Sequence, residues 1–580
     1  MTRDRDRRLV PEWAWVGLLL ILVFDVWWRG HTMGPAVTDR LDGVHLWPVV
    51  KGETEPLDCD EAAYAYMGKR LTEGAVLYRD LAENKPPGGY WIYQLAVKIG
   101  QASEWTIRWI PVPIVLLTIL LLWLAALLVA GPLAACLSSF CYVLLSTDPY
   151  LYGNGAQLEL PMNLFAVGSL VAILLALKKP GWHWPCLAGF LVGADTLVRQ
   201  VGVVSIPIYA LVIWFSMGGS EANGDRPGSV RSRCVSLVAM FVGFMVSGAI
   251  AIGVIASQGA LPAMVENVIV GAAALVADTP AAERSPPSWM RWLTGNSDPN
   301  TGALPWPFGQ TRYLVWWGCG SWPLWILGVG ALVAALVWGN RERRLVAVWT
   351  LGLCLQVVLP RQYWAHYYLL PTPGLSLLAA ILVVDAIRAR RPEPGRFVLL
   401  GRVMLVGLAT LAIAGTLFLQ VRDYLLVPPE QLTIRYKGGA QWVRLRQIGR
   451  ELDRKSSALS NPALFVWGWQ SPLYFYSGLN SPSRHFFVND LMKTQATTGH
   501  PLVSRWIQEI LDDLDRASPS LVFTGYPPFP ELEKRLRDRY QVSKVVPEAP
   551  ALWVLKQDAR PFLMEGRKLR TQPDDARSGH

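Results

Sequence analysis

The sequence is poor in charged residues and in cysteine, and it lacks the short motifs of nucleotide-binding enzymes. Only 17% of its 580 residues are charged, and seven are cysteines. Six cysteines lie in or beside apolar runs and Cys59 stands alone in a polar stretch, so neither a disulfide framework nor a cysteine-rich metal site is expected. A P-loop and a dinucleotide-binding glycine fingerprint are both missing, which argues against a nucleotide-binding enzyme. The sequence also shows no internal repeat.

Apolar stretches dominate what is present. The chain is 52% hydrophobic, and apolar windows of roughly 20 residues recur along it, flanked by Arg and Lys clusters. The formal charge of +10 would suit nucleic acid, but the basic residues lie in short loops between the apolar runs. Such residues set the orientation of a membrane protein, so we expect no nucleic-acid partner.

These windows predict an α-helical polytopic membrane protein with about eleven transmembrane helices. The first follows a basic tip and is interpreted as an uncleaved signal anchor with a cytoplasmic N-terminus. A cleaved signal peptide is the alternative, but no small-x-small cleavage site follows Trp28. The expected spans are 11–28, 107–130, 133–145, 160–177, two between 184 and 215, 234–256, 313–338, 345–359, 366–387 and 397–419.

The protein is expected in the cell (inner) membrane. The basic loops between the spans are expected on the inner side and the long loops on the outer side. After the last span, strand patterns at 463–469, 521–524 and 552–556 alternate with helical patterns and predict an extracytoplasmic (periplasmic) α/β domain. The expected domains are a transmembrane module at 1–421, with outer loops 30–105 and 257–312, the α/β domain at 422–565 and a disordered tail at 566–580. The stretch 88–100 is too short to span and predicts a helix at the interface.

This topology gathers charged side chains at the outer membrane face, where burial of charge is costly. They are Asp58, Asp60, Glu61, Lys85, Glu159, Arg199, Arg361 and His366. Charges at span ends can simply face lipid headgroups. Asp195 and Arg199, four residues apart, can instead form an ion pair within one helix, and Glu159 can be an ordinary carboxylate at a helix start.

Two parts of the first outer loop indicate chemistry. Asp58 and Asp60 match the short D-x-D pattern of transferases that bind nucleotide sugars, but those donors are absent outside the membrane. A carboxylate can also accept a proton from an attacking hydroxyl while a fixed cation stabilises a departing phosphate. Lys85, followed by two prolines, is such a cation on a stiffened backbone. An ordinary helix cap and a plain loop remain the alternatives.

Together, the segments DEAAYAYMGKRLTEGAVLYRD and ENKPPGGYW resemble the first outer loop of the GT-C membrane glycosyltransferases. The similarity is to glycosyltransferase family 39, which holds the protein O-mannosyltransferases, and to the bacterial lipid A aminoarabinose transferases. Further similarity lies in LELPMNLF, GFLVGADTLVRQVG and RQYWAHYYLLPTPG, and FVWGWQSPLYFYSGLNSPSR resembles the outer C-terminal domain of bacterial members.

The resemblance implies inverting transfer of a hexosyl or pentosyl group from a polyprenyl-phosphate donor to an acceptor hydroxyl on a protein, lipid or glycan. Its implied catalytic residues are Asp60, Glu61 and Glu159, its donor phosphate ligands Lys85, Arg199, Arg361 and His366, and its cavity residues Asp58, Tyr64, Tyr90 and Tyr367.

Two positions depart from the family pattern. Many relatives have Asp where this chain has Glu159, and the aminoarabinose transferase has Glu where this chain has Asn84. No obligatory metal is therefore expected, although a divalent metal stays open. A lipid or glycan transporter (flippase) without transferase activity, and a non-catalytic membrane scaffold, are the alternative functions.

Overall fold

The computed structural model describes residues 10–36, 53–179, 181–216, 230–271, 320–360, 364–388, 396–488, 491, 501–543, 552–560 and 562. The chain divides into two compact units. The first unit comprises Met1–Glu55, Arg108–Ala251 and Pro287–Leu432, and the second comprises Pro56–Ile107, Ile252–Pro286 and Thr433–His580. Each unit is described by itself.

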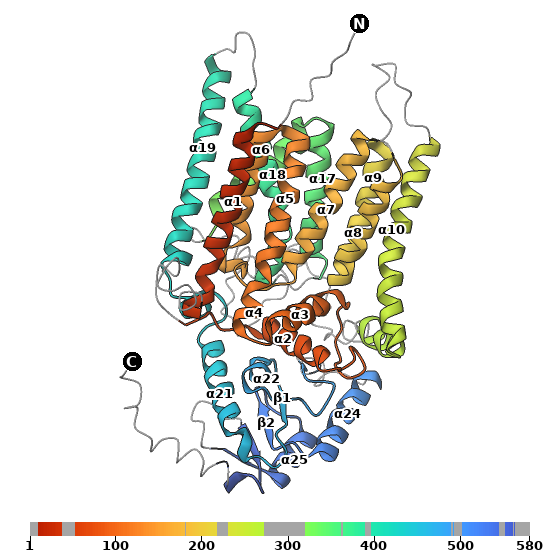
Figure 1. Cartoon of the computed structure of the whole chain (residues 1–580), viewed down its shortest axis with the longest axis vertical. Coiled ribbons are helices and arrows are strands. Elements are labelled where there is room, and N and C mark those ends of the chain that lie inside the picture. Colours follow the sequence, from red (N-terminus) through yellow and green to blue (C-terminus); the bar gives the residue numbers. More distant parts are fainter. Residues whose placement is uncertain are drawn as a thin grey trace. The chain divides into compact units, whose positions relative to one another are not determined.

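Long helices that lie side by side build the first unit (Figure 1). They are α1 (Glu12–Gly30), α5 (Pro111–Ala130), α6 (Pro132–Ser146), α7 (Glu159–Lys178), α8 (His183–Val198), α9 (Ser205–Ser216), α10 (Val230–Ser257), α16 (Trp322–Trp338), α17 (Arg341–Val358), α18 (Thr372–Arg388) and α19 (Arg396–Gln420). Short helical turns connect them: η1 (His31–Ala36), η2 (Pro149–Leu151), η3 (Gln200–Val204), η7 (Ala365–Leu369) and η8 (Val421–Leu425).

Every expected span overlaps one of these helices. Among the described residues, six helices are long and apolar enough to cross a membrane by length and composition. They include α7 and α10, whereas α6 and α16 are apolar but shorter. The chain is thus a multi-pass membrane protein with several apolar helices, and the number of crossings stays a prediction.

The helices of the first unit pack closely where small residues face a neighbour. In α8, Gly189 lies against the backbone of Met240 in α10, so that an added Cβ would be only 1.8 Å from its carbonyl oxygen. One turn later Gly193 lies equally close to Ser247. Two glycines four residues apart let helix backbones approach, which is the usual way that apolar helices associate in a membrane.

Buried polar contacts hold the connection that leads into α7. Arg29 in α1 bonds Asp25 (3.0 Å) and donates to the carbonyl oxygen of Gly153 (2.8 Å). The carboxylate of Glu55 accepts from Asn154 (2.6 Å) and lies 3.7 Å from the guanidinium of Arg108. Because these charges are buried and paired, losing one partner would strand the other, and the 148–158 segment is held firmly in front of α7.

The second unit contains the sheet. Its elements are α2 (Cys59–Thr72), α3 (Gly88–Gly100), α11 (Leu261–Met264), η5 (Val265–Gly271), α21 (Gln441–Lys455), η9 (Ser456–Ala458), β1 (Leu464–Trp467), α22 (Pro472–Ser477), α24 (Pro501–Ala517), β2 (Leu521–Thr524), α25 (Pro530–Arg539), β3 (Tyr540–Val542) and β4 (Leu552–Leu555). The unit boundaries fall within α4 (Glu104–Trp109), α10 and α20 (Pro429–Tyr436).

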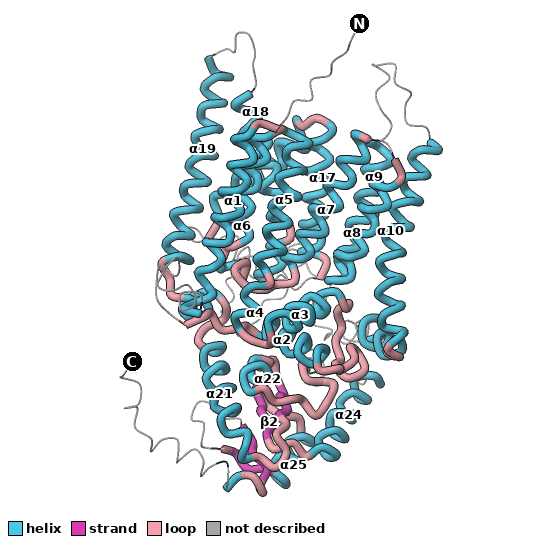
Figure 2. Tube along the Cα trace, in the orientation of Figure 1, coloured by secondary structure: helices cyan, strands magenta, loops and turns pink. Residues whose placement is uncertain are grey.

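The sheet has the strand order β1-β2-β4-β3, in which β1 and β2 are parallel and the other neighbours antiparallel. Among the described residues the named strands all lie in this unit (Figure 2). Strands β1, β2 and β4 fall on segments expected from the sequence, whereas β3 was not expected. Helices α24 and α25 cover the sheet with a core that includes Trp467, Ile510 and Leu532.

The first outer loop packs against the C-terminal residues within this unit. Helix α2 lies beside α3, where Gly68 meets the backbone of Tyr93, and beside α22. The ring of Tyr66 stacks on Tyr474 with centroids 4.9 Å apart, and its hydroxyl accepts from Ser481 N (2.9 Å). The sequence placed these segments in separate domains, and those domain boundaries stay a prediction.

Candidate active site

The acid-rich start of α2 is built as a helix cap. Asp58 precedes the first turn and accepts a hydrogen bond from Glu61 N (2.9 Å), while the Glu61 carboxylate accepts one from Asp58 N (3.2 Å). This reciprocal capping box satisfies donors that a helix start leaves open. Burial, together with the nearby charges of Glu61 and Asp60, raises the pKa of Asp58 from 3.8 to about 8.

Asp60 lies in the first turn of α2 and is half-buried, whereas Asp58 and Glu61 are buried. The positive end of the helix dipole lies at this first turn. Tyr64 follows Asp60 by one helical turn and lies on the same face of α2. Lys85 Nζ lies 5.5 Å from the centre of the Tyr64 ring. Lys85 therefore lies near the Tyr64 side chain, one helical turn after Asp60 on α2.

The Lys85 loop contains an acid that the sequence motifs did not single out. Glu83 Oε1 lies 3.5 Å from Lys85 Nζ and also accepts from Asn84 N (2.9 Å). The Glu83 side chain is only 5% exposed and that of Lys85 is 22% exposed, so the amine is the accessible member of the pair. The spacing of two residues between Glu83 and Lys85 is the feature of the sequence from which this pair could have been predicted. From the sequence, only Asn84, which lies between them, was considered.

Two of the expected cavity residues, Tyr64 and Tyr90, belong to an aromatic cluster next to this lysine. Tyr64 and Tyr90 are almost completely buried, and their rings meet edge to face with centroids 5.7 Å apart. Tyr93 joins them at 5.5 Å from Tyr64. The aromatic cluster supports the lysine loop against α2, and Lys85 lies within cation–π reach of it.

A second cluster of expected site residues lies in the first unit. Glu159 begins α7 and accepts a hydrogen bond from the Arg199 guanidinium, whose carbon lies 4.1 Å from the centre of the Tyr367 ring. The ring of His366 contacts Tyr367 at 4.9 Å and lies 6.1 Å from Tyr152. Glu159 of α7 and Tyr367 of η7 thus meet at the Arg199 guanidinium, with His366 beside Tyr367.

The alternative of an ion pair between Asp195 and Arg199 is wrong. Arg199 donates to Glu159, and both Asp195 carboxylate oxygens lack a hydrogen-bond partner among the described residues. The reason is local geometry: α8 ends at Val198, and Arg199 takes an extended conformation (φ −149°, ψ 140°) that directs it away from the helix. The i,i+4 rule applies only within a continuing helix.

Asn163, one turn into α7, is a positioning residue that the sequence did not reveal. Its amide donates to the carbonyl oxygen of Leu369 (2.9 Å), at the end of η7. That contact ties the turn carrying His366 and Tyr367 to the helix carrying Glu159.

The expected residues thus form two clusters, one in each unit. Their union in one cavity stays a prediction. Arg361 lies outside the described residues. Within the described ranges no three His, Cys, Asp or Glu side chains are grouped to hold a metal ion.

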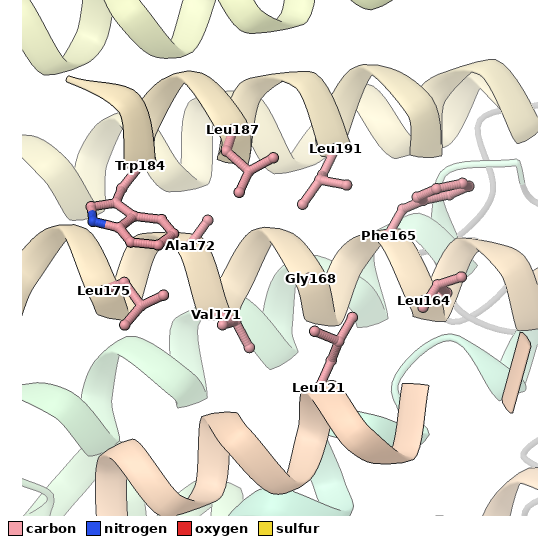
Figure 3. A pocket seen from close by; sticks show the side chains of 10 residues that line it. All are labelled: Leu121, Leu164, Phe165, Gly168, Val171, Ala172, Leu175, Trp184, Leu187 and Leu191. Atoms are coloured by element: carbon pink, nitrogen blue, oxygen red, sulfur yellow. The ribbon is translucent and has the colours of Figure 1, made fainter. Parts of the chain in front are cut away.

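A groove without polar lining residues opens between α5, α7 and α8 (Figure 3). Its volume is about 330 Å³, and Trp184 and Phe165 lie toward its opposite ends (Figure 3). Leu164, in the same groove, lies little more than one turn from Glu159 on α7.

Comparison with known proteins supports the class of protein that this fold and these clusters suggest. Residues 84–251 match the family model described as dolichyl-phosphate-mannose-protein mannosyltransferase. ArnT from Cupriavidus metallidurans, solved bound to undecaprenyl phosphate, shares the fold at a TM-score of 0.53 and 15% identity, covering 94% of this chain and 97% of ArnT. The same protein in the apo state gives 0.53 and 15% over 93% and 97%.

The oligosaccharyltransferase AglB from Archaeoglobus fulgidus, solved with an inhibitory peptide and a dolichol-phosphate, has a TM-score of 0.49 and 14% identity, covering 88% of this chain and 69% of AglB. A search of curated protein sequences finds no match. The matched family segment and the shared fold support a GT-C glycosyltransferase.

Proposed function

We propose that the chain moves a sugar from a polyprenyl-phosphate-linked donor to an acceptor hydroxyl at the outer membrane face, with inversion at the sugar carbon. The observation that carries this proposal is that Lys85 Nζ lies 5.5 Å from the ring of Tyr64, which follows Asp60 by one helical turn on α2. The matched family segment, 84–251, includes Lys85 and Arg199. The similar structure of ArnT holds undecaprenyl phosphate, which supports a donor of this kind.

In the proposed reaction Asp60 accepts the proton of the acceptor hydroxyl while that oxygen attacks the anomeric carbon. The bond between this carbon and the phosphate oxygen breaks on the opposite face, and the electron pair leaves with the polyprenyl phosphate. Asp60 suits the task because it is accessible, whereas Asp58 and Glu61 are buried in the helix cap. Lys85 stabilises the negative charge that grows on the leaving phosphate.

The cluster around Arg199 supplies the second set of phosphate ligands in this proposal. A guanidinium presents a planar fork that matches two phosphate oxygens, and His366 adds a further donor. Glu159 and the Tyr367 ring hold that fork in place before the donor binds. The apolar groove beside α7 would take isoprene units of the donor tail.

The proposed topology has about eleven spans, a cytoplasmic N-terminus and an extracytoplasmic second unit. Basic residues expected inside meet at one end of the helices in the first unit. Lys178 Nζ of α7 lies 3.8 Å from Glu342 of α17, and Arg388 of α18 donates to the carbonyl oxygen of Ala130 at the end of α5 (2.7 Å). These contacts support a common cytoplasmic face, and the boundary near residue 421 between membrane module and outer domain is kept as a proposal.

The test separates a transferase from a flippase. The purified chain in liposomes would be supplied with undecaprenyl-phosphate-linked sugars and a membrane extract as acceptor. A transferase releases free undecaprenyl phosphate and labels an acceptor, and Asp60→Asn slows both roughly 10²–10⁴-fold. Movement of intact donor between leaflets without cleavage, unchanged in Asp60→Asn, would instead establish the flippase alternative.

A further inference from the structure

An ion-pair cluster in the second unit joins three segments that are far apart in the sequence. Arg484, in the loop after α22, forms a two-pronged contact with Glu509 of α24, at 2.6 and 2.9 Å. The same guanidinium reaches Glu266 of η5 at 3.1 Å. Glu266 also accepts from the Trp506 indole (2.9 Å) and pairs with Arg505 (2.5 Å). In Figure 1 the yellow-green turns of α11 and η5 accordingly lie beside α24.

This cluster is balanced in charge and partly shielded from water, with Arg484 its most buried ionic member and Arg505 its most exposed one. The Arg484 side chain is 16% exposed, and His485 is almost completely buried with its Nε2 3.2 Å from Glu509. Burial lowers the pKa of His485, so the ring is neutral near pH 7. Although burial raises it, bonds from His485 and Arg484 lower the pKa of Glu509 to about 2. Two arginines therefore face two carboxylates, and neutralising one member leaves a partly buried charge unpaired.

The cluster also contacts the loop that carries the proposed phosphate-binding lysine. The backbone oxygen of Arg484 accepts from Ala82 N (2.9 Å), and its Nη1 approaches the carbonyl oxygen of Tyr78 (3.4 Å). Tyr78 in turn donates its hydroxyl to the carbonyl oxygen of Lys85 (2.9 Å). An unbroken series of contacts therefore runs from α24 through Arg484 and Tyr78 to the backbone of Lys85.

Tyr78 needs such support because its backbone is strained. Its φ of 68° lies in the left-handed region, which is sterically unfavourable for a residue with a bulky side chain. The ring is nevertheless fully buried, and Tyr78 N donates to the carbonyl oxygen of Leu81 (2.9 Å). Such conformations persist where the surroundings fix them, and here Arg484 contacts both sides of the turn.

We propose that Arg484 is a positioning residue for sugar transfer: clamped by Glu509 and Glu266, it fixes the Tyr78–Lys85 turn and so sets where the Lys85 amine meets the donor phosphate. The inference rests on the proposed function, and it assigns a catalytic purpose to contacts of the C-terminal residues. A displacement of about 1 Å at a group that acts on the reacting centre can reduce turnover up to roughly 100-fold. Arg484 itself does not touch the donor.

The first test measures the loop directly and needs no donor. Hydrogen exchange would be followed in the amides of 76–85 in the full chain. Arg484→Lys, which keeps the charge but loses the planar fork, should speed exchange there, and Arg484→Ala more so. Arg535→Lys is the matched control, because Arg535 of α25 pairs with Asp515 of α24 (3.0 Å) in the same unit. Equal protection of 76–85 in all variants would overturn the inference.

The second test asks whether Arg484 acts through Lys85. In single-turnover transfer, Arg484→Lys should reduce turnover roughly tenfold or more, with little change in acceptor KM. Combined with Lys85→Ala, the same change should have almost no further effect, because residues that act in series are not additive. If Arg484 has a purely structural role, the losses of turnover in the two single variants should multiply in the double variant, and that result would overturn the inference. It would do so without contradicting the proposed function, provided that the wild-type chain transfers sugar and Asp60→Asn is strongly impaired. An inactive wild-type chain instead contradicts the proposed function itself.

Discussion

Replacing Asp58 with asparagine is predicted to stabilise the fold and to leave sugar transfer intact. Asp58 caps α2 through the hydrogen bond from Glu61 N, and asparagine is an equally good cap. Burial and the charges of Glu61 and Asp60 raise the pKa of Asp58 from 3.8 to about 8. At pH 7 the folded chain therefore holds a proton that the unfolded chain releases.

The size of the effect follows from this pKa. About three pH units separate the ordinary pKa from pH 7, and each is worth about 1.4 kcal/mol, so at pH 7 the folded state loses about 4 kcal/mol of stability. Because the pKa is raised in the folded state, the loss is absent below about pH 4, grows as pH rises to about 8 and is constant above that. Asparagine does not titrate, so the advantage of Asp58→Asn should grow over the same window.

Denaturant unfolding of the purified chain in detergent at pH 5, 7 and 8.5 measures this difference. Asp58→Ala is the control, since it removes the charge and the cap together and should lose about 1 kcal/mol relative to Asp58→Asn. A variant that is less stable than the parent at pH 8.5, or a stability difference that does not change with pH, would refute the reasoning. Loss of transfer in Asp58→Asn would show that Asp58 takes part in the reaction.

Three further predictions concern the phosphate ligands and the topology. Lys85→Ala should weaken donor binding and slow single-turnover transfer, and Lys85→Arg should restore only part because a planar fork replaces a compact charge; a normal donor Kd in Lys85→Ala would contradict this role. Glu159→Gln should leave Arg199 less well held and weaken donor binding about tenfold, measured as Kd, whereas unchanged binding would make Glu159 dispensable. An impermeant thiol reagent outside the cell should label Ser457→Cys and spare Lys179→Cys, and the opposite pattern would reverse the topology.

Local sequence patterns predicted the elements that depend on interactions between residues close together in the chain. The stretch 88–100 was expected to form an interfacial helix because its apolar run is short, and α3 has these bounds while exposing Leu95 and Ile99. The Asp58-x-x-Glu61 spacing is a capping box, so the helix-cap alternative weighed for this motif is confirmed. Asp60 and Lys85 were expected to share a site, which stays a prediction; the structure places Lys85 near the ring of Tyr64, one turn after Asp60 on α2.

Contacts between residues that are far apart in the chain could not be predicted from local sequence patterns. The sequence suggested an ion pair between Arg199 and Asp195, four residues earlier, but Arg199 bonds Glu159, which is forty residues away in the sequence. The clamp of Arg484 on Glu509 and Glu266 depends on how η5 packs beside α24, which no local spacing encodes.

The assignment of Asp60 as the base is the central claim, and single-turnover transfer by Asp60→Asn tests it most directly. Undecaprenyl-phosphate-linked mannose and aminoarabinose would serve as donors, with donor Kd measured beside the rate. Asparagine keeps the size and hydrogen bonding of the side chain but cannot accept the proton, so transfer should fall roughly 10²–10⁴-fold while the Kd stays near that of the parent chain. Transfer at close to the parent rate would contradict the account, because the reaction would then need another base.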